Sequence, residues 1–175
     1  MLKKLLLCCL LAVASATVTN AQTKEITASY GGYTQMDASN MHDGWPAVNN
    51  AWGALNLGVN FRISPNIWVG PSYTFSSTTT EGGPSHSSIA YHAIMLNGRY
   101  GYYQNSIVKL YAKLGLGVEI SHMQPRGLDS YNKSYFAFQI VPVGAQVDIN
   151  RSWAIFGEAG FGAQGLLQVG VKYQF

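Results

Sequence analysis

Cysteine, charge and long apolar runs are all scarce in this 175-residue sequence. Only two cysteines are present, adjacent to each other near the N-terminus. Charged residues make up 11% of the chain, whereas a soluble domain is about one quarter charged. No segment beyond the first 21 residues holds the roughly 18 consecutive apolar residues of a transmembrane helix. Aromatic residues (13%) and 19 glycines are well represented, which indicates that something other than water faces much of the surface.

The N-terminus has the three parts of a secretory signal peptide. Two lysines precede the apolar run 5–14, and small and polar residues follow it. This run is about half the roughly 20 residues that a membrane-spanning helix needs. Thr19-Asn20-Ala21 offers small side chains at both positions that a signal peptidase reads, so we expect residues 1–21 to be removed and 22–175 to form the mature protein.

The expected mature chain contains no cysteine, because Cys8 and Cys9 both lie in the leader. Leu5-Leu6-Leu7 ahead of them lacks the small residue that a lipoprotein signal places before its cysteine, so we expect no lipidation. Disulfides and thiolate metal sites are then excluded from residues 22–175. Loss of two lysines leaves nine basic against eight acidic side chains, a net charge of +1. This balance does not favour a nucleic-acid partner.

Alternation of apolar and polar residues with a period of two recurs along the mature chain and predicts β-strands. In the segment 107–120, for example, the apolar residues at even positions from Val108 to Ile120 share one face, and Lys109, Lys113 and Glu119 lie on the other. The faces exchange parity near Pro142, where we expect a β-bulge because proline removes a ladder donor. Eight strands are predicted: Glu25–Met36, Ala51–Ile63, Asn66–Thr80, Ile89–Tyr103, Ile107–Ile120, Ser134–Ile149, Trp153–Phe161 and Leu166–Phe175.

Short and long connections alternate between these strands. The short ones are made of turn residues: 64–66, 104–106 and 150–152. The longer ones are 37–50, 81–88 and 122–133, with the four residues 162–165 as the exception. Outer-membrane barrels have short periplasmic turns and longer external loops. The sequence therefore predicts an all-β protein, an eight-stranded antiparallel up-and-down transmembrane β-barrel with both termini in the periplasm.

The apolar parity must then face lipid, since only a closed sheet satisfies all backbone polar groups in hydrocarbon. Aromatic residues near strand ends suit the interfacial girdles, and they are Trp52, Trp68, Tyr73, Phe75, Tyr102, Tyr103, Trp153, Phe161, Tyr173 and Phe175. The alternative is a soluble β-sandwich with ordinary strand aromatics. The export signal and the recurring apolar face favour the barrel.

The inward parity carries four acids and five bases: Glu25, Arg62, Arg99, Lys109, Lys113, Glu119, Asp148, Glu158 and Lys172. Side chains fill the interior of an eight-stranded barrel, so we expect these charges to form paired networks across the lumen. They act either as a plug that holds the barrel in shape or as a polar conduction path. The high cost of isolated buried charges favours the plug.

The signal peptide, the alternating strands and the terminal segment Val171-Lys172-Tyr173-Gln174-Phe175 resemble the small outer-membrane barrels of the OmpX, OmpW and OmpA-transmembrane type. The resemblance covers essentially the whole mature chain. It implies that Val171, Tyr173 and Phe175 form the signal read by the barrel assembly machinery. The chain is too short for an added peptidoglycan-binding domain.

Catalysis and metal binding are weaker hypotheses. His86-Ser87-Ser88 resembles the His-x-Ser pair of lipid A deacylase barrels, but no Asp or Glu follows between Ile89 and Tyr103 to orient the histidine. The pair is then interpreted as loop residues. His42, His86 and His122 fall in predicted external loops and His92 at a strand's outer end, but their spacing matches no compact ligand motif. We therefore expect no enzymatic activity, no cofactor and no metal.

Two functional hypotheses remain. The first is a monomeric structural or surface-interaction barrel that supports envelope integrity, with outer-membrane lipids and lipopolysaccharide as its surroundings. The loop 37–50, with Met41, His42 and Trp45, is amphipathic enough to contact lipopolysaccharide or a partner. The second, as for OmpW-like proteins, is a small pore or a carrier of hydrophobic compounds. A charge-paired lumen favours the first, and an apolar pocket opening through the wall favours the second.

Overall fold

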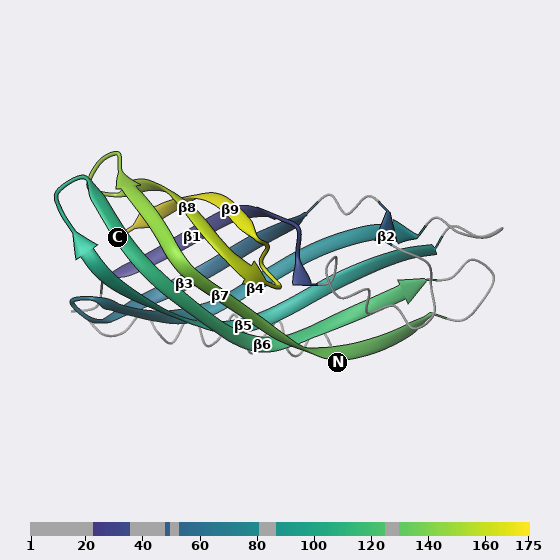
Figure 1. The fold of residues 1–175 in the computed structure, drawn as a ribbon. Helices are drawn as coiled ribbons and strands as arrows, with labels where there is room; N and C mark the ends of the chain where they lie inside the picture. Colours follow the sequence, from purple (N-terminus) through teal and green to yellow (C-terminus); the bar gives the residue numbers. More distant parts are fainter. Residues whose placement is uncertain (1–22, 36–47, 50–52, 81–86, 125–129) are drawn as a thin grey trace.

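The computed structural model describes residues 23–35, 48–49, 53–80, 87–124 and 130–175, and these fold into a single closed antiparallel sheet (Figure 1). Its strands are β1 (Lys24–Gly32), β2 (Val48–Asn49), β3 (Ala54–Ser64), β4 (Ile67–Thr80), β5 (Ser87–Gln104), β6 (Val108–Gln124), β7 (Tyr131–Asp148), β8 (Trp153–Gly162) and β9 (Leu167–Gln174). Each long strand pairs with its sequence neighbours, and β1 pairs with β9 to close the ring. The predicted eight-stranded barrel is confirmed, and the two-residue β2 beside β4 was not predicted. No helix in the described part of the chain is long and apolar enough to cross a membrane.

The strands differ in length, so one wall of the barrel is taller than the other. Strands β4 to β7 have 14, 18, 17 and 18 residues, whereas β1, β3, β8 and β9 have 9, 11, 10 and 8. The long strands extend well past the short ones in Figure 1. Because β6 continues to Gln124 and β7 begins at Tyr131, half of the predicted loop 122–133 is strand. The prediction that His122 lies in a loop is wrong, because His122 pairs with Ala90 and Asn132 in the sheet.

At the other end of the barrel, three tight turns connect neighbouring strands at the positions that the sequence predicts. Asn105 Oδ1 accepts hydrogen bonds from the backbone N–H groups of Ile107 and Val108, at 2.9 and 2.6 Å. Asn150 Oδ1 does the same for Ser152 and Trp153, at 2.9 and 2.8 Å. These side chains replace partners that the turning backbone cannot supply, which explains the asparagine in each turn. In the third turn, Ser64 pairs directly with Ile67 across Pro65-Asn66.

The predicted β-bulge near Pro142 is confirmed. Tyr111 of β6 pairs with Gly144, but Lys113, two residues later, pairs with Val141, so β7 carries one extra residue here. Pro142 and Val143 both face outward. The inward face of β7 accordingly changes from odd to even positions, and Asp148 can face the lumen.

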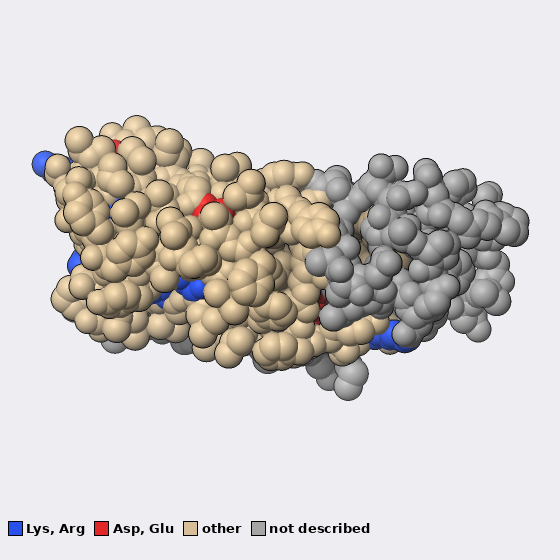
Figure 2. Space-filling view, in the orientation of Figure 1, with Lys and Arg blue, Asp and Glu red and all other residues tan. Residues whose placement is uncertain are grey.

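Apolar side chains cover the outside of the barrel. Leu57, Leu96, Phe136 and Val169 are each 57–65% exposed, far more than large apolar residues are in most soluble cores. The described part of the face drawn in Figure 2 is mostly uncharged, with few blue or red atoms. A continuous apolar exterior of this kind fits contact with hydrocarbon.

The connection between β8 and β9 folds into the barrel. Gly162 and Gly165 have φ angles of +139° and +112°, which glycine adopts without strain. A Cβ on Gly162 would lie 2.1 Å from the Phe138 carbonyl oxygen, so there is no space for a side chain. These two glycines place Ala163 and Gln164 inside, where they are 4% and 2% exposed.

Candidate functional site

The barrel lumen holds the polar cluster, and its best-buried member is Glu25 of β1. The Glu25 side chain is 0% exposed. Its carboxylate forms ion pairs with Arg99 of β5 at 2.7 Å and with Lys172 of β9 at 3.0 Å. Asn60 of β3 donates to the same carboxylate at 3.1 Å. One acid therefore joins residues of four strands, and its two cationic partners offset the cost of burying it.

The contacts of Glu25 form one ionic layer across the lumen, and a second ionic layer lies further from the tight turns. Lys113 of β6 forms an ion pair with Glu158 of β8 across the lumen. The Tyr111 hydroxyl donates to Glu158 Oε1 at 2.8 Å, and Lys113 Nζ donates to Gln164 Oε1 at 2.9 Å. Gln164 in turn donates to Ser72 Oγ at 2.9 Å. The infolded β8–β9 turn is thus tied into the layer.

The turn end of the lumen carries a more exposed pair. Lys109 Nζ lies 2.6 Å from Asp148 Oδ2, with side chains 33% and 22% exposed. Gln146 donates to Asp148 at 2.5 Å and accepts from Lys172 Nζ. Gln146 therefore connects this pair to the layer around Glu25.

Trp68 lies inside the barrel, so its assignment to an interfacial girdle is wrong. Its ring is 5.0 Å from the Arg99 guanidinium carbon, 5.9 Å from that of Arg62 and 6.0 Å from Lys172 Nζ. The parity of β4 explains this position, because Ile67 and Val69 on either side face outward. Arg62, for which an ion pair was predicted, instead donates to the Pro65 carbonyl oxygen at 2.8 Å.

Glu119 also faces inward, with 2% exposure. It lies six positions beyond Lys113 on β6, about 20 Å along the strand at roughly 3.3 Å per residue. It therefore belongs to the tall end of the molecule and not to the ionic layers described above. All nine predicted lumen residues are on inward faces, but they do not form a single network.

The neutral part of the lumen was not predicted from the sequence. Gln139 Oε1 accepts from the Gln164 backbone N–H at 2.9 Å, and Asn97 donates to Ser72 Oγ at 2.7 Å. Toward the tall end the filling becomes apolar, with Ala93, Met95, Ala137 and Ala163 packed together at 0–4% exposure. The predicted lumen residues were chosen only because they are charged. Amide and apolar side chains on the same inward face were therefore not included.

Two small cavities remain within this filling. One, about 60 Å³, lies at the turn end and is lined by Glu25, Trp68 and Lys172 among others. The other, about 40 Å³, borders Asn97, Glu158 and Gln168. Arg99 and Tyr111 line both and so stand between them. At roughly 10–15 Å³ of such space per water, each holds only a few water molecules.

Residues 5–175 match the family described as "Outer membrane protein beta-barrel domain". The chain belongs to this family. As a member of the outer membrane protein β-barrel family, the protein resides in the bacterial outer membrane, and its apolar exterior faces lipid. A search of curated proteins found no match.

Solved structures show the same fold at low sequence identity. The N-terminal β-barrel domain of Pseudomonas aeruginosa OprF is 11% identical, with a TM-score of 0.55 over 87% of this chain and 97% of that one. Neisserial surface protein A (NspA) is 12% identical, with a TM-score of 0.57 over 88% and 97%. Yersinia pestis Ail, in complex with the heparin analogue sucrose octasulfate, is 17% identical, with a TM-score of 0.50 over 88% and 97%.

The predicted assembly-signal residues of this family member share the outward face of β9. Val171, Tyr173 and Phe175 are 45%, 38% and 58% exposed. The Tyr173 ring lies 5.0 Å from Trp153 and 5.8 Å from Phe175, measured between centroids. This aromatic group is at the turn end of the barrel, where a periplasmic interface is expected.

The histidines considered for catalysis or metal binding were predicted to lie at the tall end of the barrel, opposite the tight turns. His42 and His86 lie outside the described residues, and Ser88 is in β5. His92 Nδ1 lies 2.6 Å from the Tyr73 hydroxyl, and His122 Nδ1 lies 2.6 Å from Asn132 Oδ1. Within the described ranges, no three His, Cys, Asp or Glu residues gather as metal ligands do.

Proposed function

We propose that this outer-membrane barrel has a structural, envelope-integrity or surface-interaction role, with an occluded polar lumen and no enzymatic activity. The main support for this proposal is the way side chains fill the lumen. Ion-paired layers around Glu25 and Glu158 cross it, Gln164 is folded into it, and the two cavities between these side chains are only about 60 and 40 Å³. Such a filling stiffens the barrel wall by joining strands that are not neighbours in the sheet.

Export and assembly complete the proposal. Residues 1–21 act as a cleaved signal peptide, and Val171, Tyr173 and Phe175 form the signal for the barrel assembly machinery. The outward direction of all three side chains, with the aromatic residues Tyr173 and Phe175 at the end of the chain, supports this role. We propose a monomer surrounded by outer-membrane lipids and lipopolysaccharide.

The surface-interaction role concerns the tall end. Strands β4 to β7 extend beyond the short wall, and their outward faces become polar there, with Ser134, Asn132 and His122 in place of apolar residues. A polar sheet above the apolar band is suited to contact with lipopolysaccharide sugars or a partner. Ail, a barrel of the same fold, was solved with a heparin analogue bound, which supports the idea that such barrels carry ligand sites.

Single-channel conductance in planar bilayers tests the occluded lumen. Heat-modifiable gel mobility first shows that the refolded protein is a barrel. We expect no conductance steps from the wild type, nor from Glu158→Gln or Lys113→Gln, because several other side chains still fill the lumen. Conductance steps that change with these substitutions would contradict the plug and support the alternative of a small pore.

A further inference from the structure

The turn end of the lumen opens into a larger hollow. This vestibule, about 410 Å³, lies between the 105–107 and 149–152 turns, and it is lined by Lys109, Asp148, Arg151, Trp153, Lys172 and Gln174 among others. Lys109, Lys172 and Gln174 also line the 60 Å³ cavity. The two hollows are therefore adjacent and share walls.

Positive charge dominates this part of the molecule. Five cationic side chains line the two hollows: Arg62, Arg99, Lys109, Arg151 and Lys172. The acidic side chains that line them are Glu25 and Asp148, which leaves an excess of three positive charges. At the same rim, the Lys24 backbone N–H donates to the C-terminal carboxylate of Phe175 at 3.2 Å, and neither residue lines either hollow.

The two acids do not neutralise this set. Glu25 is shared between Arg99 and Lys172, and Asp148 pairs with Lys109. Among the residues that the structure describes, Arg62 and Arg151 have no ion-pair partner. Lys172 is 2% exposed, so part of the excess charge is buried.

A low-dielectric wall strengthens the field of such a cluster, because lipid and protein surround it and screening by water is reduced. A mobile anion that enters the vestibule would offset the excess and supply acceptors for guanidinium and ammonium donors. We propose that the vestibule is an anion-binding site that takes a small carboxylate or phosphate group. The site extends the function beyond an inert plug, and it stands whether or not the lumen conducts.

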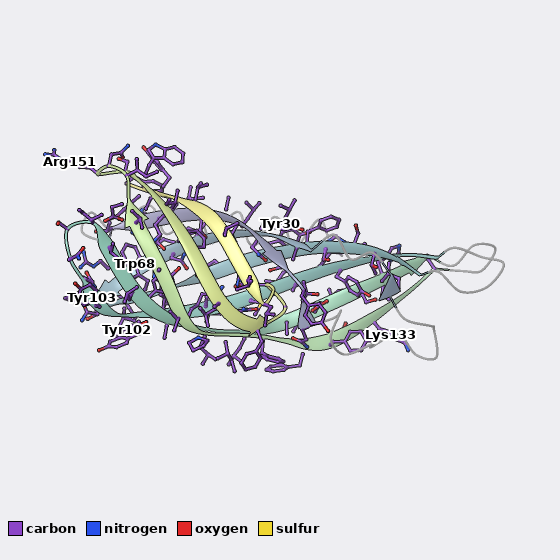
Figure 3. The ribbon with its side chains drawn as sticks, turned by 45° about the horizontal axis from the view of Figure 1, so that its top comes forward. Tyr30, Trp68, Tyr102, Tyr103, Lys133 and Arg151 are labelled. Atoms are coloured by element: carbon purple, nitrogen blue, oxygen red, sulfur yellow. The ribbon has the colours of Figure 1, made fainter. Side chains whose placement is uncertain are left out.

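The sizes of the two hollows define the ligand. The vestibule, at about 410 Å³, can hold a phosphate or acetate-sized group with some of its water, whereas the inner cavity of about 60 Å³ holds only a few water molecules. Arg151 lies at the outer tip of the turn end, and Lys133 is at the far end of the barrel (Figure 3). This separation provides a matched control for the loss of one positive charge.

Backbone-amide chemical-shift titration of the protein, refolded in zwitterionic detergent micelles, tests the site. Sodium phosphate and sodium acetate are the probes, at low ionic strength. We expect saturable shifts concentrated at residues 104–108 and 148–153. Arg62→Gln with Arg151→Gln should weaken binding by about tenfold or more, since together they remove two positive charges from the walls of the adjoining hollows. Lys133→Gln should change it by less than about twofold, since Lys133 lies at the far end of the barrel and its field is weaker at that distance.

Asp148→Asn provides a test with the opposite sign. Removing this acid raises the positive excess, so it should tighten phosphate binding in a variant that still shows the gel mobility of a folded barrel. Shifts that stay linear in anion concentration, or that spread equally to residues near Lys133, would overturn the proposal. So would equal affinities in the Arg62/Arg151 variant and the wild type.

Lipid nanodiscs can distinguish two possible sources of the anionic group, a phospholipid headgroup and a free anion. If a phospholipid headgroup occupies the vestibule, nanodiscs containing phosphatidylglycerol should weaken the phosphate titration relative to phosphatidylcholine alone. If the natural ligand is a free anion, the two lipid compositions should give the same titration. Both results support an anion site and differ only in its occupant.

Discussion

The ion pair between Lys113 and Glu158 allows the proposed structural role of the lumen to be measured. Glu158→Ala removes the carboxylate that pairs with Lys113 and accepts the Tyr111 hydroxyl at 2.8 Å. The side chains of Glu158 and Lys113 are only 4% and 12% exposed, so Lys113 loses its counter-charge inside the barrel. Removal of one partner of a buried pair costs about 3–5 kcal/mol. The adjacent 40 Å³ cavity lets water solvate part of the ammonium, so we expect about 3 kcal/mol, near the lower limit.

Urea unfolding in lipid vesicles, followed by gel mobility of the folded and unfolded forms, measures this loss. With a slope of about 1–3 kcal/mol per molar urea, the midpoint should fall by about 1–3 M. Ala159→Gly is the matched control, because the next residue of β8 faces outward and contacts neither layer. It should cost only about 0.5–1 kcal/mol.

A double-mutant cycle separates the ion pair from general damage to the barrel. Glu158→Gln, Lys113→Gln and the double variant keep most of the side-chain volume. We expect a coupling free energy on the order of 2 kcal/mol, within the range for residues in one buried network. Coupling near zero, or a Glu158→Ala midpoint no lower than that of Ala159→Gly, would refute the view that the ionic layers hold the barrel in shape.

Two further predictions concern the infolded turn and the inward tryptophan. Gly162→Ala should destabilise the barrel by about 1–3 kcal/mol in the same urea assay, because it combines a strained positive φ with a clash against Phe138. Gly98→Ala, where a Cβ would meet open space, should have little effect, and equal losses would contradict the close packing of the turn. In vesicles of brominated lipid, Trp153→Phe should lower the lipid-quenchable part of the fluorescence and Trp68→Phe should not. The opposite result would place Trp68 outside the barrel.

The strands in contact with lipid were predictable because the membrane imposes a period of two on them. Leu114, Leu116 and Val118 of β6 alternate with Gly115, Gly117 and Glu119 for this reason. Beyond the apolar band both faces of a strand meet polar surroundings, so the pattern fades. The extension of β6 through His122 to Gln124 was therefore interpreted as a loop.

The inner contacts were less predictable. Parity places Lys113 and Glu158 inside, but their partnership depends on the stagger of β6, β7 and β8, which the bulge at Pro142 shifts. Gln164 had no periodic signal, because it lies in a four-residue turn, and only the flanking Gly162 and Gly165 indicated unusual backbone. Trp68 was misplaced because residue type was given more weight than the parity of β4.

The bonds made by Glu25 have a consequence for the order of assembly. β1 and β9 are the first and last strands of the barrel, so their pairing is the step that turns an open sheet into a ring. Glu25 comes from one edge, Lys172 from the other, and Arg99 from the wall between them. A sheet in which β1 and β9 are still apart cannot contain both ion pairs. The seam is therefore also where the buried charges of Glu25 and Lys172 are neutralised, and the completed ring is stabilised by a bond that an open sheet lacks.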